Sequence, residues 1–296
     1  MTVPLSFLRY QAPNIVGMFG NGLRSALPRA VGGRTPDSAP LHRRLEPVPP
    51  ALIEAYAEWT GAPADRYRDE LPPHLFSYWA LGLIADLTGR VPYNVLSIVN
   101  QGCRMVVRRP LPTDEVLDVT GRLGEIVDDG RRIRIATHLE IGTDGAPGAQ
   151  SVDVLTAVPH RNPKRPRSAA PREPARTFET VGTWSAAAGD GRAFALLTGD
   201  FNPLHTLELV ARRTRYNGCI LHGFGLLSRT YETLRNAGVD IAVFDVRYVK
   251  PVPLPSAELA VTLAREADAD GGRALRLASP DGTLHMAGHL HEKEPA

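Results

Sequence analysis

The stretch LLTGDFNPLHTLELVARR, residues 196–213, concentrates side chains that could perform chemistry. A turn requires glycine, asparagine or proline, but it does not require a carboxylate and an imidazole five positions apart. A carboxylate and an imidazole that face the same space can hold one water molecule and exchange its protons. The spacing therefore predicts acid–base chemistry, and the alternative interpretation is a capped surface loop with an exposed imidazole. The residues of the predicted site are Gly199, Asp200, Asn202, Pro203 and His205.

The composition of the chain limits the classes of protein to which it can belong. The chain has 296 residues, enough for two domains or one large one, and it is 43% hydrophobic and 22% charged, as in ordinary globular proteins. Its 34 basic and 32 acidic residues give a net charge of +2, which provides no general attraction to nucleic acid or anionic membranes. No apolar run reaches the roughly 18 residues of a membrane span. Two distant cysteines, Cys103 and Cys219, argue against a disulfide framework or a cysteine zinc site and favour a reducing cytoplasm.

Two segments of biased composition divide the chain. Residues 1–36 contain four arginines and no acidic residue, which is compatible with a transit peptide, but we expect an arm that lies on the folded body. Residues 160–177 contain four prolines and one acidic residue, which is typical of a solvated, semi-extended linker. The predicted domains are therefore 37–159 and 178–296.

The two halves repeat one order of elements. Each has a long, mostly apolar helical segment followed by runs rich in β-branched residues, and these runs are separated by Pro, Asp and Gly. The pattern predicts an α+β fold in which an antiparallel sheet wraps a central helix twice, and the alternative is one mixed domain. Helices are expected at 49–61, 72–89, 190–199, 205–218 and 221–238. Strands are expected within 94–111, 115–127, 131–143, 148–160, 178–186, 240–255, 257–268, 272–282 and 283–293.

Three segments of the second half resemble one known family. TGDFNPLH matches the Gly-Asp-x-Asn-Pro-aliphatic-His signature of the MaoC-like (R)-specific enoyl-thioester hydratases, which include mycobacterial 3-hydroxyacyl-thioester dehydratases. LHGFGLLS resembles the His-Gly segment that opens the central helix of that family, and VRYVKPVPLP resembles its Lys-Pro strand. The resemblance implies a double hotdog, with two antiparallel sheets that each wrap a long central helix, joined in one chain.

The resemblance also implies a reaction and roles for the site residues. The reaction is the reversible hydration of trans-2-enoyl thioesters to (R)-3-hydroxyacyl thioesters, with no cofactor and no metal. Asp200 would accept a hydrogen from the attacking water, and His205 would orient the water and share its proton. Asn202 would pin the turn. The backbone N–H of Gly223, at the start of a helix, would stabilise the enolate oxygen.

The substrate would be an acyl thioester of coenzyme A or of an acyl-carrier protein. A basic cluster could meet the phosphates or an acidic carrier, although exposed helix charge would explain it as well. Phe201, Ser228 and Tyr231 could reach the acyl cavity, although core packing would also explain Ser228 and Tyr231. We expect His222 to make a structural hydrogen bond. The basic cluster comprises Arg212, Arg213, Arg215 and Lys250.

The first half lacks the motif and instead has TGAPADRYRDELPPH. We therefore expect one active site per chain, with the first half shaping the acyl pocket and Asp65 and His74 dispensable for turnover. His289 and His291, two residues apart on a terminal strand, predict a solvated face more than a metal site. A hotdog thioesterase and a non-catalytic acyl-thioester-binding subunit remain as alternatives, and the protein could be a monomeric double hotdog or a homodimer.

Overall fold

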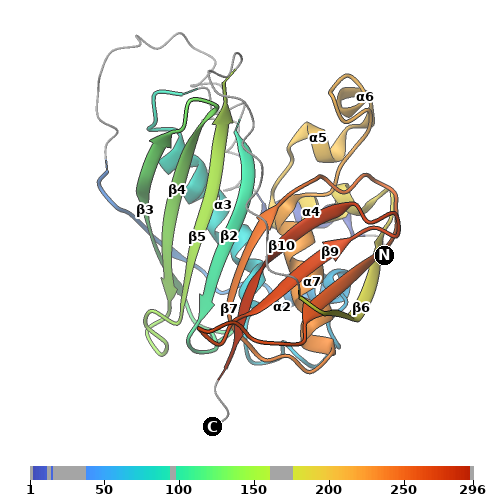
Figure 1. The fold of residues 1–296 in the computed structure, drawn as a ribbon. Coiled ribbons are helices and arrows are strands. Elements are labelled where there is room, and N and C mark those ends of the chain that lie inside the picture. The colour runs from blue at the N-terminus through green and yellow to red at the C-terminus, as the bar shows by residue number, and fades with distance from the viewer. Residues whose placement is uncertain (1–2, 12–14, 16–37, 94–97, 161–175, 294–296) are drawn as a thin grey trace.

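The computed structural model describes residues 3–11, 15, 38–93, 98–160 and 176–293. Within these residues, ten antiparallel strands form one continuous sheet in the order β1-β3-β4-β5-β2-β7-β10-β9-β8-β6 (Figure 1). Five strands come from each half of the chain. The predicted 1–36 arm and 160–177 linker fall mostly outside the described residues.

The first half supplies one side of the sheet and its helices. The predicted helices at 49–61 and 72–89 are confirmed, whereas the short strand β1 was not predicted. The elements are η1 (Leu5–Tyr10), β1 (Leu41–Leu45), α2 (Pro50–Thr60), η2 (Pro73–Leu75), α3 (Phe76–Thr88), β2 (Val99–Val107), β3 (Leu117–Asp128), β4 (Arg132–Gly142) and β5 (Gln150–Pro159).

The second half repeats this order. The elements are β6 (Phe178–Ala186), α4 (Asp190–Thr198), α5 (Pro203–Thr206), α6 (Glu208–Ala211), α7 (Gly223–Asn236), β7 (Ile241–Tyr248), β8 (Ser256–Ala264), β9 (Arg273–Ala278) and β10 (Leu284–Glu292). The single helix predicted at 205–218 is wrong. It is replaced by α5, α6 and turns, because Leu207 between them has an extended backbone (φ −123°, ψ 98°).

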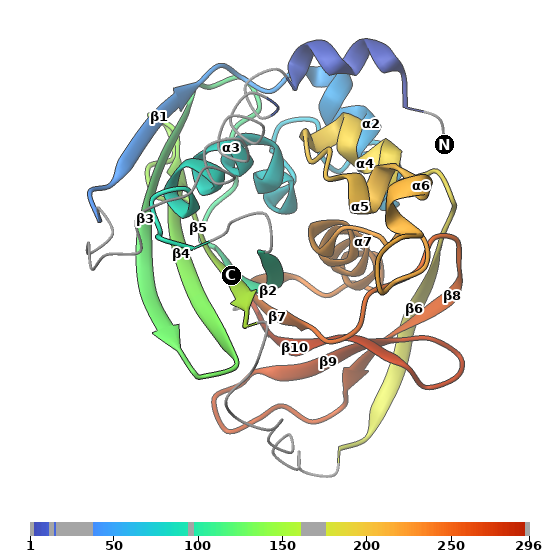
Figure 2. The same cartoon turned by 90° about the horizontal axis from the view of Figure 1, so that it is seen from above.

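The sheet curves around the two central helices. Viewed from above, α3 lies inside the N-terminal half of the wall and α7 inside the C-terminal half, with α2 and α4 on the side away from the strands (Figure 2). Strands β2 and β7 join the halves edge to edge, with Cys103 opposite Val246 and Met105 opposite Phe244. All four of these side chains are fully buried. The predicted α+β double hotdog is confirmed, with its two sheets fused at this seam.

A polar network between α2, η2 and α7 ties the halves together. The carboxylate of Glu232 on α7 accepts hydrogen bonds from His74 (2.7 Å), Tyr67 and Arg66. The Tyr56 hydroxyl, which donates to the His74 carbonyl oxygen (2.9 Å), extends the network. His74 and Glu232 are both fully buried. His74 is thus part of the core between the halves.

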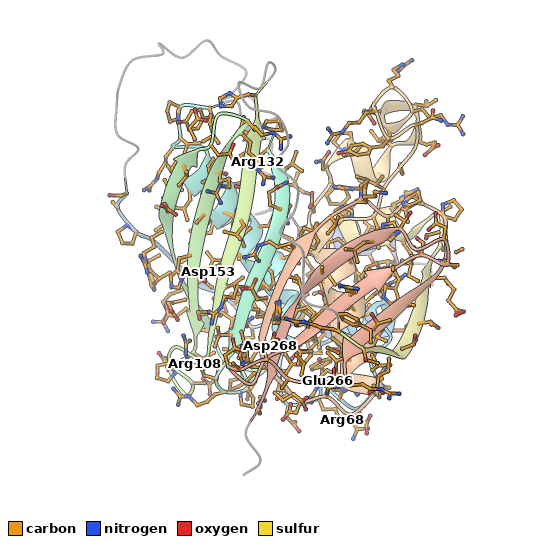
Figure 3. All side chains as sticks on the ribbon, viewed as in Figure 1. Arg68, Arg108, Arg132, Asp153, Glu266 and Asp268 are labelled. Atoms are coloured by element: carbon orange, nitrogen blue, oxygen red, sulfur yellow. The ribbon has the colours of Figure 1, made fainter. Side chains whose placement is uncertain are left out.

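The outer face of the sheet is charged and faces away from the helices. Asp153, labelled in Figure 3, pairs across β4 and β5 with His138 at 2.7 Å. His289 pairs with Asp268 at 3.2 Å, and His291 lies 3.9 Å from Asp270. In the described part of the chain no group of three or more His, Cys, Asp or Glu residues has a metal-binding arrangement. No described helix is both long and apolar enough to cross a membrane.

Residues 3–11 of the N-terminal arm lie against the second half of the chain. Val3 and Phe7 are buried, and the Gln11 side-chain amide donates to the carbonyl oxygen of Leu196 on α4 at 3.0 Å. Because Gln11 is fully buried, this contact belongs to the core.

Candidate active site

The predicted catalytic turn connects α4 to α5. Helix α4 ends at Gly199, whose φ of 84° is in the left-handed region that favours glycine. Asp200 follows, and Asn202 caps α5 by accepting a hydrogen bond from the Leu204 N–H at 3.1 Å. Pro203 occupies the first helical position, where its missing N–H costs nothing. Asn202 is exposed, and its hydrogen bond makes it a capping residue of the turn.

A backbone contact presses this turn against α4. A Cβ atom at Gly191 would lie 2.0 Å from the carbonyl oxygen of His205, so no other residue fits without moving the turn. Helix α4 itself is held by the buried Asp190, which accepts hydrogen bonds from Trp59 Nε1 (3.3 Å) and Arg229 Nη1 (2.8 Å). The position of His205 therefore depends on α2, α4 and α7 together.

Hydrogen bonding selects the tautomer of His205. Its Nδ1 lies 2.8 Å from the carbonyl oxygen of Ile220, and because a carbonyl oxygen can only accept, Nδ1 carries the proton. In the neutral ring, Nε2 is then unprotonated and can accept a proton from water. His222 donates from Nε2 to the carbonyl oxygen of Asp200 at 2.9 Å. The expected structural hydrogen bond of His222 is present.

Burial shifts the pKa values of the acid–base pair toward each other. It raises the pKa of Asp200 above its ordinary value, against the charge of His205 and the Asn202 N–H, which lower it. It lowers the pKa of His205, against the opposing effect of Asp200. The pKa of His222 falls well below its ordinary value, through burial and then the charge of His205. Transfer of a proton between Asp200 and His205 thereby costs less than between free side chains.

The first turn of α7 offers backbone donors beside the pair. His222 is its N-cap but makes no side-chain cap hydrogen bond. The first bond along the helix runs from the Leu226 N–H to the His222 carbonyl oxygen at 3.0 Å, so the N–H groups of Gly223, Phe224 and Gly225 have no partner within the helix. They form the positive end of a 14-residue helix dipole. The Gly223 N–H, the predicted oxyanion donor, is therefore free of any hydrogen bond within the helix.

The acyl-cavity candidates have different surroundings. Ser228 is fully buried, donates to the Phe224 carbonyl oxygen (2.7 Å) and contacts the Tyr56 hydroxyl (2.7 Å). Tyr231 is 3% exposed and packs against the rings of His74 and Phe244. Both lie in the core between the halves, as the core-packing interpretation expects.

Phe201 differs from these two residues because it is only partly buried and packs against the edge of the core. It immediately follows Asp200 in the catalytic turn. Among the three acyl-cavity candidates it is the one that lies in the same turn as the acid–base pair.

The basic cluster follows the turn on an exposed projection. Arg212 caps the C-terminus of α6 and pairs with Glu208 at 2.8 Å, while Arg213 and Arg215 are exposed in the turns beyond. Figure 1 shows α5 and α6 standing out from the body. Lys250 is exposed just after β7. The cluster is therefore available to solvent beside the catalytic turn.

Three residues that the sequence prediction missed contribute to this site. Gly191 had a signal, because glycine inside a helix costs about 1 kcal/mol and often marks a close contact. Glu208 accepts from the Cys219 N–H at 3.0 Å and so fastens α6 to the segment before α7. Tyr248 packs its ring on Gly223. Nothing in the sequence distinguishes Glu208 or Tyr248 from ordinary surface and strand residues.

A hollow of about 660 Å³ opens elsewhere, on the outer face of the sheet between β2, β7 and β10. Its lining includes Arg104, Asp245 and His289, which are paired or exposed charges on the face opposite α7. None of the predicted catalytic residues lines it.

The chain has the fold of a double hotdog protein, and part of its second half matches a model of a known family. Residues 168–277 match the family described as MaoC like domain, which includes the catalytic turn, α7 and β7. The resemblance predicted from the sequence is thus confirmed for this domain. The chain is 25% identical over 243 residues, 78% of its length, to 3-hydroxyacyl-thioester dehydratase X of Mycobacterium tuberculosis, of which it covers 81%.

Solved structures agree on the fold. The crystal structure of HtdX from Mycobacterium tuberculosis superposes with a TM-score of 0.69 at 20% identity over 86% of this chain and 100% of that one. A MaoC-like dehydratase from Phytophthora capsici gives 0.70 at 14% identity, over 87% of this chain and 96% of that one. A conserved hypothetical protein of Mycobacterium tuberculosis, described as a double hotdog, gives 0.54 at 11% identity, over 90% and 100%.

Proposed function

We propose that the protein interconverts trans-2-enoyl thioesters and (R)-3-hydroxyacyl thioesters, with Asp200 and His205 as its acid–base pair. The observation that carries the proposal is the hydrogen bond from His205 Nδ1 to the Ile220 carbonyl oxygen. It leaves Nε2 as a base, next to the unpaired N–H groups of α7. The similarity to a 3-hydroxyacyl-thioester dehydratase supports the same reaction class.

The proposed reaction begins with a water held by Asp200 and His205. The water oxygen forms a bond to C3 as its proton passes to His205 Nε2, and the π electrons of the C2–C3 bond move toward the thioester oxygen. The Gly223 N–H stabilises that oxygen, an interaction worth about two to three orders of magnitude in rate at comparable sites. C2 then takes a proton from the pair, which restores the starting state. Dehydration is the reverse.

The proposed organisation has one site per chain. The segment that follows α2 has no acid–base pair in a capped turn, and its His74 is fully buried beside Glu232. We propose that 37–159 and 178–296 are the two hotdog domains, with the first shaping the acyl pocket. Cys103 and Cys219 are free thiols, which supports the cytoplasm as the proposed compartment.

The alternatives use the same fold. In a thioesterase the water would attack the carbonyl carbon and release a thiol. In a binding subunit, neither reaction would occur, and the presence of both Asp200 and His205 in one turn argues against it. No observation in the described structure favours either over the hydratase.

A crotonyl-CoA assay separates these functions. We would follow enoyl absorbance and free thiol together, and identify the product against (R)- and (S)-3-hydroxybutyryl-CoA. Loss of the enoyl band without thiol release, yielding the (R) product, is expected for the wild type and for Asp65→Asn, a change at an exposed residue. Thiol release with the enoyl band intact would replace the proposal with a thioesterase, and inhibition by a chelator would contradict the metal-free reaction.

A further inference from the structure

Tyr248 stands at the end of β7, directly beside the first residue of α7. Val246 and Phe244, two and four positions earlier on the same face of the strand, are fully buried. A Cβ atom at Gly223 would lie 2.7 Å from Tyr248 Cε2 and 3.0 Å from Cζ, the carbon that carries the hydroxyl. The hydroxyl end of the ring thus packs on the start of the helix.

The Tyr248 hydroxyl is buried and has no hydrogen-bond partner among the described residues. By contrast, the Tyr56 hydroxyl contacts both the His74 carbonyl oxygen and Ser228. An unpaired buried hydroxyl is rare in folded proteins and often indicates a group that a ligand will satisfy. Burial also raises the pKa of Tyr248 well above its ordinary value, so the phenol keeps its proton and can donate.

A second unpaired polar atom borders the same helix turn. His222 is 1% exposed, and its Nδ1 has no partner among the residues described. The unpaired backbone donors of Gly223, Phe224 and Gly225 lie in this turn as well. Because His222 Nε2 carries the ring proton, its Nδ1 is an acceptor, and the unpaired donors of this region are the backbone N–H groups and the Tyr248 hydroxyl. A thioester carbonyl oxygen has two lone pairs to offer such donors.

We propose that Tyr248 donates its hydroxyl hydrogen to the thioester carbonyl oxygen of the substrate, alongside the backbone N–H of Gly223. The inference rests on the proposed function, because it requires a thioester at the start of α7. The hydrogen bond strengthens as negative charge moves onto that oxygen, so its effect falls mainly on kcat. Tyr248 thereby becomes a catalytic residue in addition to the acid–base pair.

Tyr248→Phe tests the role because it removes only the hydroxyl. We expect kcat for crotonyl-CoA to fall roughly ten- to hundred-fold while the melting temperature stays equal or rises, since an unpaired buried group is lost. Tyr56→Phe is the matched control, because it removes a buried, partnered hydroxyl outside the site. It should lower the melting temperature and leave kcat within about twofold.

A spectroscopic readout separates a contact with substrate from an indirect effect. The carbonyl stretching band of bound crotonyl-CoA should lie at lower frequency in the wild type than in Tyr248→Phe, and Tyr56→Phe should match the wild type. An unchanged kcat and an unchanged band in Tyr248→Phe would refute the role of Tyr248 while leaving the hydratase intact. A wild-type protein that binds crotonyl-CoA but does not hydrate it would refute the proposed function, and the carbonyl band would still report on Tyr248.

Discussion

The imidazole ring of His222 lies against that of His205, with the ring centroids 3.9 Å apart and the planes tilted by 33°. His222 also donates to the carbonyl oxygen of Asp200, so one buried side chain contacts both members of the acid–base pair. The ring of Phe194 packs on His222, with the ring centroids 4.8 Å apart. An imidazole that acts as a base must point its unprotonated nitrogen at the reacting water. A ring held in one orientation by its neighbours meets this requirement.

Replacing Asp200 with Asn should abolish activity without destabilising the protein. Activity should fall at least about a hundredfold, because the acid–base partner is lost. Burial raises the pKa of Asp200, so the folded state binds this proton more tightly than the unfolded state does, and the carboxylate destabilises the fold at neutral pH. Asp200→Asn should therefore melt at the same or a higher temperature at pH 7.

The pH dependence of stability tests whether the Asp200 carboxylate destabilises the fold. Any stability advantage of Asp200→Asn should shrink as the pH falls toward about 4, where the wild-type carboxyl becomes protonated. Melting temperatures of the wild type and the variant, recorded between about pH 4 and pH 8, measure this difference in stability. A clear drop in melting temperature at pH 7 would show that Asp200 is a structural residue.

The dependence of the hydration rate on pH should reveal the lowered pKa of His205. Because burial lowers that pKa below its usual value of about 6.5, the neutral, basic ring persists into mildly acidic solution. The kcat/KM for hydration should stay flat as the pH falls through about 6.5 and decline only below it. A decline centred at or above that value would contradict the lowered pKa of His205.

Replacing Gly191 with Ala should damage catalysis from outside the motif. The new methyl group would collide with the His205 carbonyl oxygen, and a shift of about 1 Å at a catalytic group can cost about a hundredfold in rate. Gly189→Ala is the matched control, because nothing lies within 4 Å of a Cβ at that position. The kcat for crotonyl-CoA and the melting temperature should be measured for both variants. Equal kcat values for Gly191→Ala and Gly189→Ala would show that the turn can move without loss of activity.

The sequence predicted the local turn better than the path of the chain around it. The spacing of Gly199, Asp200, Asn202 and His205 encodes a local turn, and local turns follow from local residues. The break at Leu207 does not, because the residues from 205 to 218 are acceptable helix formers. Tertiary contacts interrupt that helix, since Glu208 is fastened to the Cys219 N–H and the His205 carbonyl is pressed on Gly191.

Long-range pairing explains the other differences. The repeat of helix and strands indicates two wrapped sheets, but only the antiparallel register of β2 and β7 shows that they fuse into one. His74 reads as an isolated histidine in the sequence. Its role depends on Glu232, which lies 158 residues away along the chain, and a single sequence carries no signal for such a contact.

The buried Glu232 should govern stability and not turnover. Glu232→Ala leaves Arg66 and His74 without their partner, a loss of about 3–5 kcal/mol when one member of a buried ion pair is removed. Glu179→Ala, which removes an exposed pair with Arg265, should cost less than about 1 kcal/mol. Urea unfolding measures both, and the kcat of folded Glu232→Ala should remain near the wild-type value. Equal unfolding free energies for the two variants would contradict the network.

Acid should remove the stabilisation that Glu232 provides. Burial alone would raise its pKa, but the hydrogen bonds from His74 and Tyr67 and the charge of Arg66 bring that pKa below its ordinary value. The contribution to stability is therefore complete above the unfolded-state pKa of about 4.3 and is lost as the pH falls through the folded-state pKa. The stability gap between wild type and Glu232→Ala should narrow in that range.

The basic cluster on the projection should affect substrate capture more than chemistry. Arg212, Arg213 and Arg215 are exposed beside the catalytic turn, and Arg212 is already paired with Glu208. Each exposed contact with a phosphate or an acidic carrier surface is worth about 1 kcal/mol or less. Changing all three to Ala should raise KM several-fold and leave kcat nearly unchanged, and the effect should weaken as salt screens the charges.

A matched triple variant separates local contacts from net charge. Arg68, Arg108 and Arg132 are also exposed but lie at other parts of the surface (Figure 3). Changing these three to Ala alters the net charge equally, so it should leave KM unchanged if the projection is the docking surface. Measuring both variants at low and high ionic strength, with enoyl-CoA and with enoyl-carrier-protein substrates, also identifies the carrier, because the KM rise should be larger for the natural one. Equal KM values for the two triple variants would show that the cluster is only a solvated surface.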